Sequence, residues 1–152
     1  MIRFLEPPAS FDRITEFIFL GSRIATLDDF HRLKAHGVRA CVDMKREGAD
    51  PWTFEAFLWL PTIDHDAPSQ VHLRMGIAFL RQCERGRMPV FVHCMAGVGR
   101  SSTLVLAYLL AGEYAERGPE DALDFLCERR ACVDPNARQI AAAVEAAKGF
   151  RG

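Results

Sequence analysis

The residues with the clearest chemical potential are a cysteine and an arginine with five residues between them. Cys94 begins and Arg100 ends a segment that contains Gly97 and Gly99, and Ser101 follows it. Glycines permit tight backbone turns in which successive N–H groups point inward as an anion-binding nest. An arginine fork can hold two oxygens of a tetrahedral oxyanion. The segment therefore predicts a phosphate cradle, whose groups come from Met95, Ala96, Gly97, Val98, Gly99 and Arg100.

Cys94 is the candidate nucleophile of this segment. The thiolate rather than the thiol attacks electrophiles, and a positive field favours the thiolate. A thiolate beneath a bound phosphoryl group can attack phosphorus in line with the leaving oxygen. The Ser101 hydroxyl can hydrogen-bond the thiolate and help to expel it when water attacks the intermediate. His93 directly precedes the cysteine, and we expect it to support the reaction by fixing the loop geometry.

The leaving oxygen needs a proton donor, and two upstream aspartates are candidates. Asp64 and Asp66 lie in the segment that leads through Pro68 into the next expected helix. Either residue can act as general acid only if it is protonated when the leaving group departs. Asp66 could instead lie near the positive N-terminus of that helix. The residues alone leave both assignments open.

The segment His93-Cys94 to Arg100-Ser101 resembles the signature of the cysteine-dependent protein tyrosine phosphatases. Its centre, Ala96 to Gly99, resembles the dual-specificity branch of that superfamily. The resemblance extends to the segments 19–22 and 130–139, although Ala131 stands where the family usually has proline. Among the two aspartates, Asp64 matches the family pattern for the general acid, because it lies four residues before Pro68.

The resemblance implies a phosphomonoester hydrolase that uses a phosphocysteine intermediate on Cys94. Arg100 and the loop amides would bind phosphate, and Asp64 would act as general acid and then as base, with no metal or other cofactor. The implied substrates are phosphotyrosine and, by extension, phosphoserine and phosphothreonine in proteins. A phosphatidylglycerophosphate-type lipid, a phosphoglucan and a non-catalytic phosphate-binding module are the alternatives.

Other anion-binding classes fit the sequence less well. A Walker-type nucleotide site needs a Gly-Lys-Ser/Thr ending, which the loop lacks. Low-molecular-weight phosphatases carry a similar loop near the N-terminus with the acid downstream, whereas here the acid precedes the loop. A rhodanese-like sulfurtransferase would need neither Asp64 nor Ser101.

Short apolar strands that alternate with helices surround this segment. Strands are expected over 17–20, 38–44, 57–60 and 90–92, and helices after Thr26 and Ser69, over about 100–114, from Pro119 and near Asp134-Pro135. This alternation predicts an α/β domain with a mostly parallel sheet flanked by helices on both faces. The site would lie where the strand before Cys94 ends and the next helix begins, as is usual for such folds.

The composition agrees with one small domain over 1–152, preceded by an extended arm over 1–10. The chain has 152 residues and a formal net charge of −1, which excludes a broadly basic nucleic-acid-binding surface. The apolar run 103–112 is about half as long as a membrane span requires. We expect a cytoplasmic monomer.

Cysteine usage points to the same compartment. Five cysteines occur without C-x-x-C spacing, which argues against a disulfide framework and a structural zinc site. One of the other four could form a protective disulfide with Cys94 on oxidation, and the sequence does not select the partner. Asn136 and Gln139 are expected to have structural or water-positioning roles.

Overall fold

The computed structural model describes residues 7–150 and contains a central sheet with strand order β1-β2-β5-β3-β4. The strands are β1 (Phe11–Arg13), β2 (Ile18–Gly21), β3 (Ala40–Lys45), β4 (Ala56–Thr62) and β5 (Val90–His93). Strand β1 pairs antiparallel with β2, and the remaining pairs are parallel. The carboxyl ends of β2, β3, β4 and β5 therefore meet at one edge of the sheet.

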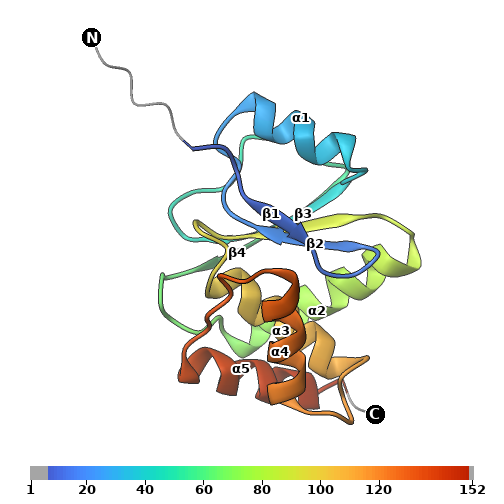
Figure 1. Cartoon of the computed structure of the whole chain (residues 1–152), viewed down its shortest axis with the longest axis vertical. Coiled ribbons are helices and arrows are strands. Elements are labelled where there is room, and N and C mark those ends of the chain that lie inside the picture. Colours follow the sequence, from blue (N-terminus) through green and yellow to red (C-terminus); the bar gives the residue numbers. More distant parts are fainter. Residues whose placement is uncertain (1–6, 151–152) are drawn as a thin grey trace.

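Helices cover both faces of this sheet (Figure 1). Helix α1 (Leu27–Ala35) lies on one face. The other face carries α2 (Gln70–Arg85), α3 (Arg100–Ala111), α4 (Pro119–Arg129) and α5 (Ala137–Lys148). The expected α/β architecture, a mostly parallel sheet with helices on both sides, is confirmed.

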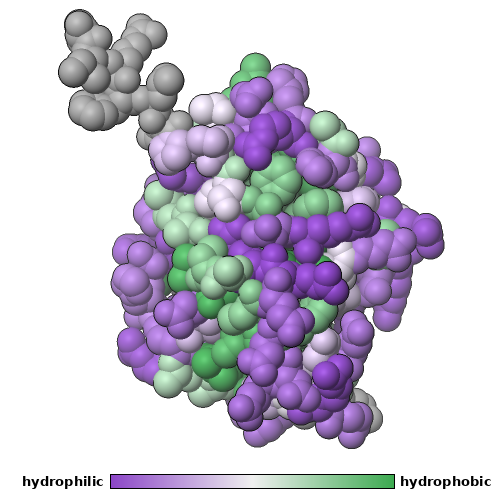
Figure 2. Space-filling model, viewed as in Figure 1, coloured by the Kyte–Doolittle hydropathy of each residue, from purple (hydrophilic) through white to green (hydrophobic). Residues whose placement is uncertain are grey.

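Two apolar cores hold these layers together. The larger core lies between the sheet and α2–α5, and the smaller one lies between the sheet and α1. Every residue of α3 except Tyr108 is buried, as expected for a helix that is apolar nearly all round. On the face shown in Figure 2, hydrophobic side chains gather below α1 and again over the lower helices, with a hydrophilic band between them.

Short sequence signals mark where most of the helices begin. The Thr26 side chain caps α1 and Ser69 caps α2, as expected. Gly37, just after α1, adopts a φ of +88°, the left-handed conformation that favours glycine. The last helix begins at Ala137, with Asn136 rather than Asp134-Pro135 at its N-cap.

Other boundaries differ from expectation. Helix α3 ends at Ala111 instead of near residue 114, and β4 is longer at both ends than the segment 57–60. The three-residue edge strand β1 was not expected. Of the expected arm over 1–10, residues 1–6 lie outside the described part, and residues 7–10 contain no helix or strand.

None of the helices within residues 7–150 is long and apolar enough to cross a bilayer.

Candidate active site

The loop between β5 and α3 places Cys94 at the base of a pocket of about 450 Å³. The side chain is buried, with 3% of the residue exposed. Its Sγ lies 3.1 Å from Ser101 Oγ and accepts the Gly97 N–H at 3.3 Å. The pocket is lined by Asp64, His65, Cys94, Met95, Ala96, Val98, Gly99, Arg100, Asp134, Asn136 and Gln139. The structure thus brings the expected nucleophile, arginine and Asp64 together.

The loop carbonyls are turned away from this pocket. Those of Ala96 and Gly97 each accept a hydrogen bond of 3.0 Å from the buried guanidinium of Arg130. The Met95 and Val98 carbonyls accept backbone N–H bonds of 3.0 Å from Arg23 and Asp134. In a planar trans peptide the N–H points opposite to the carbonyl. The amides of residues 96–99 are therefore turned inward, as an oxyanion cradle requires.

Gly97 is the position where this loop tolerates only glycine. Its φ is +71°, and a Cβ placed there would lie 2.5 Å from the carbonyl group of Gly21. The close approach arises because Gly21, at the end of β2, is aligned with His93, at the end of β5. The tight loop therefore depends on the neighbouring strand as well as on its own sequence.

Arg100 is almost fully buried and is fixed by two partners. Its Nη1 donates to the Thr62 carbonyl at 2.8 Å, and its two Nη atoms reach the Glu47 carboxylate at 2.6 and 3.1 Å. The hydrogen bond from Arg100 holds the pKa of Glu47 below its ordinary value. The Nε atom of Arg100 is the one buried side-chain nitrogen or oxygen without a hydrogen-bond partner within residues 7–150. A bound oxyanion could accept from this Nε.

Sequence reasoning missed Glu47. The residue lies 53 positions before its arginine partner, and no local pattern links the two. The sequence feature that could have identified Glu47 is its position just after a buried strand. Because the carboxyl ends of parallel strands meet at one edge of the sheet, such a residue is expected near the Cys94–Arg100 loop.

The two candidate acids occupy different positions. Asp64 lines the pocket, with its Oδ1 3.6 Å from Arg100 Nε and its side chain 60% exposed. Asp66 is not among the lining residues, and its backbone groups bond Ile63 and Gln139. The geometry favours Asp64 as the acid that faces a bound phosphoryl group.

The loop that carries Asp64 is fastened to the start of α5. Asn136 Nδ2 donates to the His65 carbonyl at 2.8 Å, and Gln139 Nε2 donates to the Asp66 carbonyl at 3.1 Å. Asn136 and Gln139 also form a reciprocal capping box. These contacts give both residues a structural role at the pocket rim.

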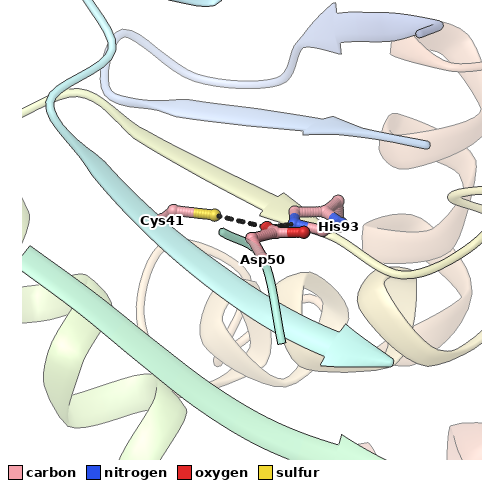
Figure 3. Close-up of side chains that lie close together, drawn as sticks. All are labelled: Cys41, Asp50 and His93. Atoms are coloured by element: carbon pink, nitrogen blue, oxygen red, sulfur yellow. Dashed lines mark hydrogen bonds and ion pairs between the residues drawn. The ribbon is translucent and has the colours of Figure 1, made fainter. Parts of the chain in front are cut away.

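A buried cluster of charged side chains lies next to Cys94, and Figure 3 shows its members Asp50 and His93 together with Cys41. His93 contacts the Cys94 carbonyl through Nδ1 at 3.1 Å and the Asp50 carboxylate through Nε2 at 2.5 Å. Asp50 also lies 3.1 Å from the Lys45 ammonium, which bonds Asp43 at 2.9 Å. Burial alone would raise the pKa of Asp50, but the hydrogen bond and charge of His93 lower it below its ordinary value. The cluster holds His93 in a fixed orientation next to Cys94.

Cys41, Asp50 and His93 also have the donor types of a metal site. Their ligand atoms lie within 4.8 Å of one another. However, Asp50 already accepts from His93 and from Lys45, and Cys41 Sγ is 3.8 Å from the same carboxylate. The ammonium of Lys45 supplies the cation that this site needs, so we assign no metal to it.

Comparisons with known proteins agree with this geometry. Residues 18–148 match the family model described as dual specificity phosphatase, catalytic domain. The chain is 29% identical over 127 residues to tyrosine-protein phosphatase vhp-1 of Caenorhabditis elegans, covering 81% of this chain and 19% of that protein. It is 39% identical over 83 residues to dual specificity protein phosphatase 22 of Homo sapiens, covering 53% and 43%. The matched regions span less than half the length of these relatives.

Solved structures share the fold. PTPMT1 in complex with PI(5)P has a TM-score of 0.78 at 24% identity, covering 92% of this chain and 96% of that one. The human tyrosine phosphatase-like serine/threonine/tyrosine-interacting protein has a TM-score of 0.80 at 23% identity, covering 93% and 98%. At these identities the likeness concerns the fold alone. Because the family model covers most of its residues, the chain belongs to the dual specificity phosphatase family.

Proposed function

We propose that the chain is a protein phosphatase that removes phosphate from phosphotyrosine, and also from phosphoserine and phosphothreonine, through a phosphocysteine. The observation that carries this proposal is the buried Cys94 thiol between the Ser101 hydroxyl and the Gly97 amide, at the base of a pocket that Arg100 and Asp64 share. The names of the curated relatives, tyrosine-protein and dual specificity protein phosphatases, support a protein substrate.

The first step transfers the phosphoryl group to sulfur. The Cys94 thiolate attacks phosphorus while the bond from phosphorus to the leaving oxygen breaks. Arg100 and the inward amides of residues 96–99 hold the three equatorial oxygens of the phosphoryl group while it moves to sulfur. Asp64 gives its proton to the leaving oxygen, so the dephosphorylated hydroxyl product departs neutral.

The second step returns the enzyme to its starting state. The Asp64 carboxylate accepts a proton from water as that water attacks phosphorus. The phosphorus–sulfur bond breaks, inorganic phosphate forms, and the departing thiolate accepts a hydrogen bond from Ser101. The inward amides and the arginine supply the positive field throughout.

The proposal includes a cytoplasmic location and a monomeric state. Five scattered cysteines fit a compartment that keeps thiols reduced.

Phosphate release from a substrate panel tests the function, with the Cys94→Ser protein as blank. The panel holds a phosphotyrosine peptide, a phosphothreonine peptide, phosphatidylglycerophosphate and a phosphorylated glucan. We expect release from the peptides that depends on Cys94. Release from the lipid or the glucan alone would contradict the protein substrate, and no release at all would favour a binding module.

A further inference from the structure

A second depression lies beside the catalytic pocket, at the carboxyl ends of β3 and β4. It measures about 510 Å³ and is lined by Arg46, Glu47, Ile63 and Asp64. Asp64 lines the catalytic pocket as well, so the two depressions adjoin. Lys45 is aligned with Thr62 across the two strands. The residues that follow them, Arg46 and Ile63, therefore lie next to each other.

Arg46 is the free cation of this depression. Its neighbour Glu47 is occupied by the bidentate contact with Arg100. Arg46 itself is exposed and makes no ion pair or hydrogen bond with another residue of the described range 7–150. An arginine fork of this kind matches a carboxylate.

Two exposed apolar side chains lie in or near the depression: Ile63 lines it, and Trp59 belongs to the strand β4 that leads to it. Ile63 is 50% exposed and Trp59 is 42% exposed. The Trp59 indole donates to the Lys45 carbonyl at 2.8 Å, which places the ring beside the turn that carries Arg46. Single exposed apolar residues are common, but a group of them that adjoins a pocket is typical of a binding surface.

The charges of the lining favour a peptide over a membrane surface. The two depressions together are lined by two arginines, Arg46 and Arg100, and by three carboxylates, those of Glu47, Asp64 and Asp134. Anionic bilayers bind clusters of basic residues, and this lining has no such cluster. A peptide segment can present one carboxylate and one apolar side chain at the required spacing.

We propose that Arg46, Ile63 and Trp59 form a flanking subsite for the residues next to the phosphorylated residue of a phosphopeptide. An acidic side chain of the peptide binds Arg46, and a large apolar side chain packs against Ile63 and Trp59. This inference rests on the proposed phosphatase function and adds the class of peptide that the site selects.

The test compares kcat/KM for phosphotyrosine peptides that differ only beside the phosphotyrosine. In the first pair of peptides, a residue next to the phosphotyrosine is either Asp or Lys. In the second pair, a residue next to the phosphotyrosine is either Leu or Ser. We expect a preference for Asp over Lys of about threefold to fivefold, as for an exposed ion pair, and for Leu over Ser of about fivefold. Arg46→Glu should reverse the first preference, and Ile63→Ala should reduce the second.

Two controls separate this subsite from the catalytic machinery. Arg85→Glu makes the same charge change at the exposed last turn of α2, before the amino end of β5, and should leave both preferences unchanged. p-Nitrophenyl phosphate has no flanking residues, so its kcat/KM reports the phosphate site alone. Dividing each variant's peptide kcat/KM by its value for this ester removes any effect on the catalytic step.

The outcomes distinguish the two levels of the proposal. Equal kcat/KM for the Asp and Lys peptides, or an Asp preference that survives Arg46→Glu, would overturn the subsite while leaving the phosphatase intact. Hydrolysis of a phosphorylated lipid in anionic vesicles but of no peptide would overturn it in favour of a membrane substrate. Absence of Cys94-dependent release even from p-nitrophenyl phosphate would instead refute the proposed function.

Discussion

Replacing Lys45 by methionine tests the buried charge cluster beneath the catalytic loop. The change keeps a long apolar stem but removes an ammonium group 2.9 Å from Asp43 Oδ2 and 3.1 Å from Asp50 Oδ1. The two carboxylate side chains are 0% and 1% exposed. Without the ammonium, the Asp43 carboxylate would keep only backbone N–H donors among these contacts, and the Asp50 carboxylate would keep the His93 ring.

The expected loss of stability follows from these contacts. Hydrogen bonds to charged groups contribute about 1.5–3 kcal/mol each, so the two carboxylate contacts of Lys45 sum to ~3–6 kcal/mol. Removing one partner of a buried ion pair costs roughly 3–5 kcal/mol. We therefore expect Lys45→Met to lower the free energy of unfolding by about 4 kcal/mol near neutral pH.

The pH dependence of this loss gives the sharper test. Burial already raises the pKa of Asp43 above its ordinary value, and removing the ammonium raises it further. A carboxyl group with a higher pKa in the folded chain takes up a proton on folding. The loss of stability is therefore full at pH values above the raised pKa of Asp43 in the folded chain. It becomes smaller as the pH falls toward about 3.9, the ordinary pKa of an aspartate in the unfolded chain.

Urea unfolding followed by circular dichroism measures this, at about pH 7 and about pH 5. Lys148→Met is the matched control, because its ammonium is exposed and 3.5 Å from Glu145, and it should change stability by less than about 0.5 kcal/mol. A loss below about 1 kcal/mol for Lys45→Met, or a loss that does not shrink at the lower pH, would refute the reasoning.

Three further predictions concern the catalytic loop and its surroundings. Asp64→Asn should lower kcat by about 10²–10⁴, while Asp66→Asn stays within a few-fold; the reverse order in steady-state kinetics would move the general acid to Asp66. Glu47→Gln should lower kcat/KM about tenfold, since the buried arginine loses a charged bidentate partner worth ~1.4 kcal/mol or more; an unchanged kcat/KM would show that the contact does not position the arginine. Gly97→Ala should destabilise the fold by at least about 2 kcal/mol in urea unfolding and abolish turnover, because its Cβ would overlap the carbonyl of the adjacent strand; a stable, active variant would contradict the close approach.

The sequence was most informative where the site is contiguous. Cys94, Arg100 and Ser101 lie within one strand–loop–helix segment, so their types and spacing already predict a cradle. Helix starts were equally local, because Thr26 and Ser69 cap their own helices. Such signals are visible in a window of a few residues.

The missed residues act over long sequence separations. Asp50 meets His93 across 43 positions and Glu47 meets Arg100 across 53, both from the turn between β3 and β4. Only the parallel pairing of β3 with β5 brings that turn to the catalytic loop. Strand β1 escaped notice for a related reason, since three residues at a sheet edge owe their conformation to β2 rather than to their own pattern.

The burial of α3 also determines how the site responds to ionic strength. The positive N-terminus of α3 and the buried Arg100 attract a bound phosphate electrostatically, and most of the space between these charges is protein rather than solvent. Dissolved ions screen charges in such surroundings much less than at the surface. Arg46 is exposed, and salt at physiological concentration screens such a charge beyond about 8 Å. Raising the salt concentration should therefore leave turnover of a small phosphate ester nearly constant while it weakens selection among peptides, so ionic strength separates catalysis from recognition in a single protein.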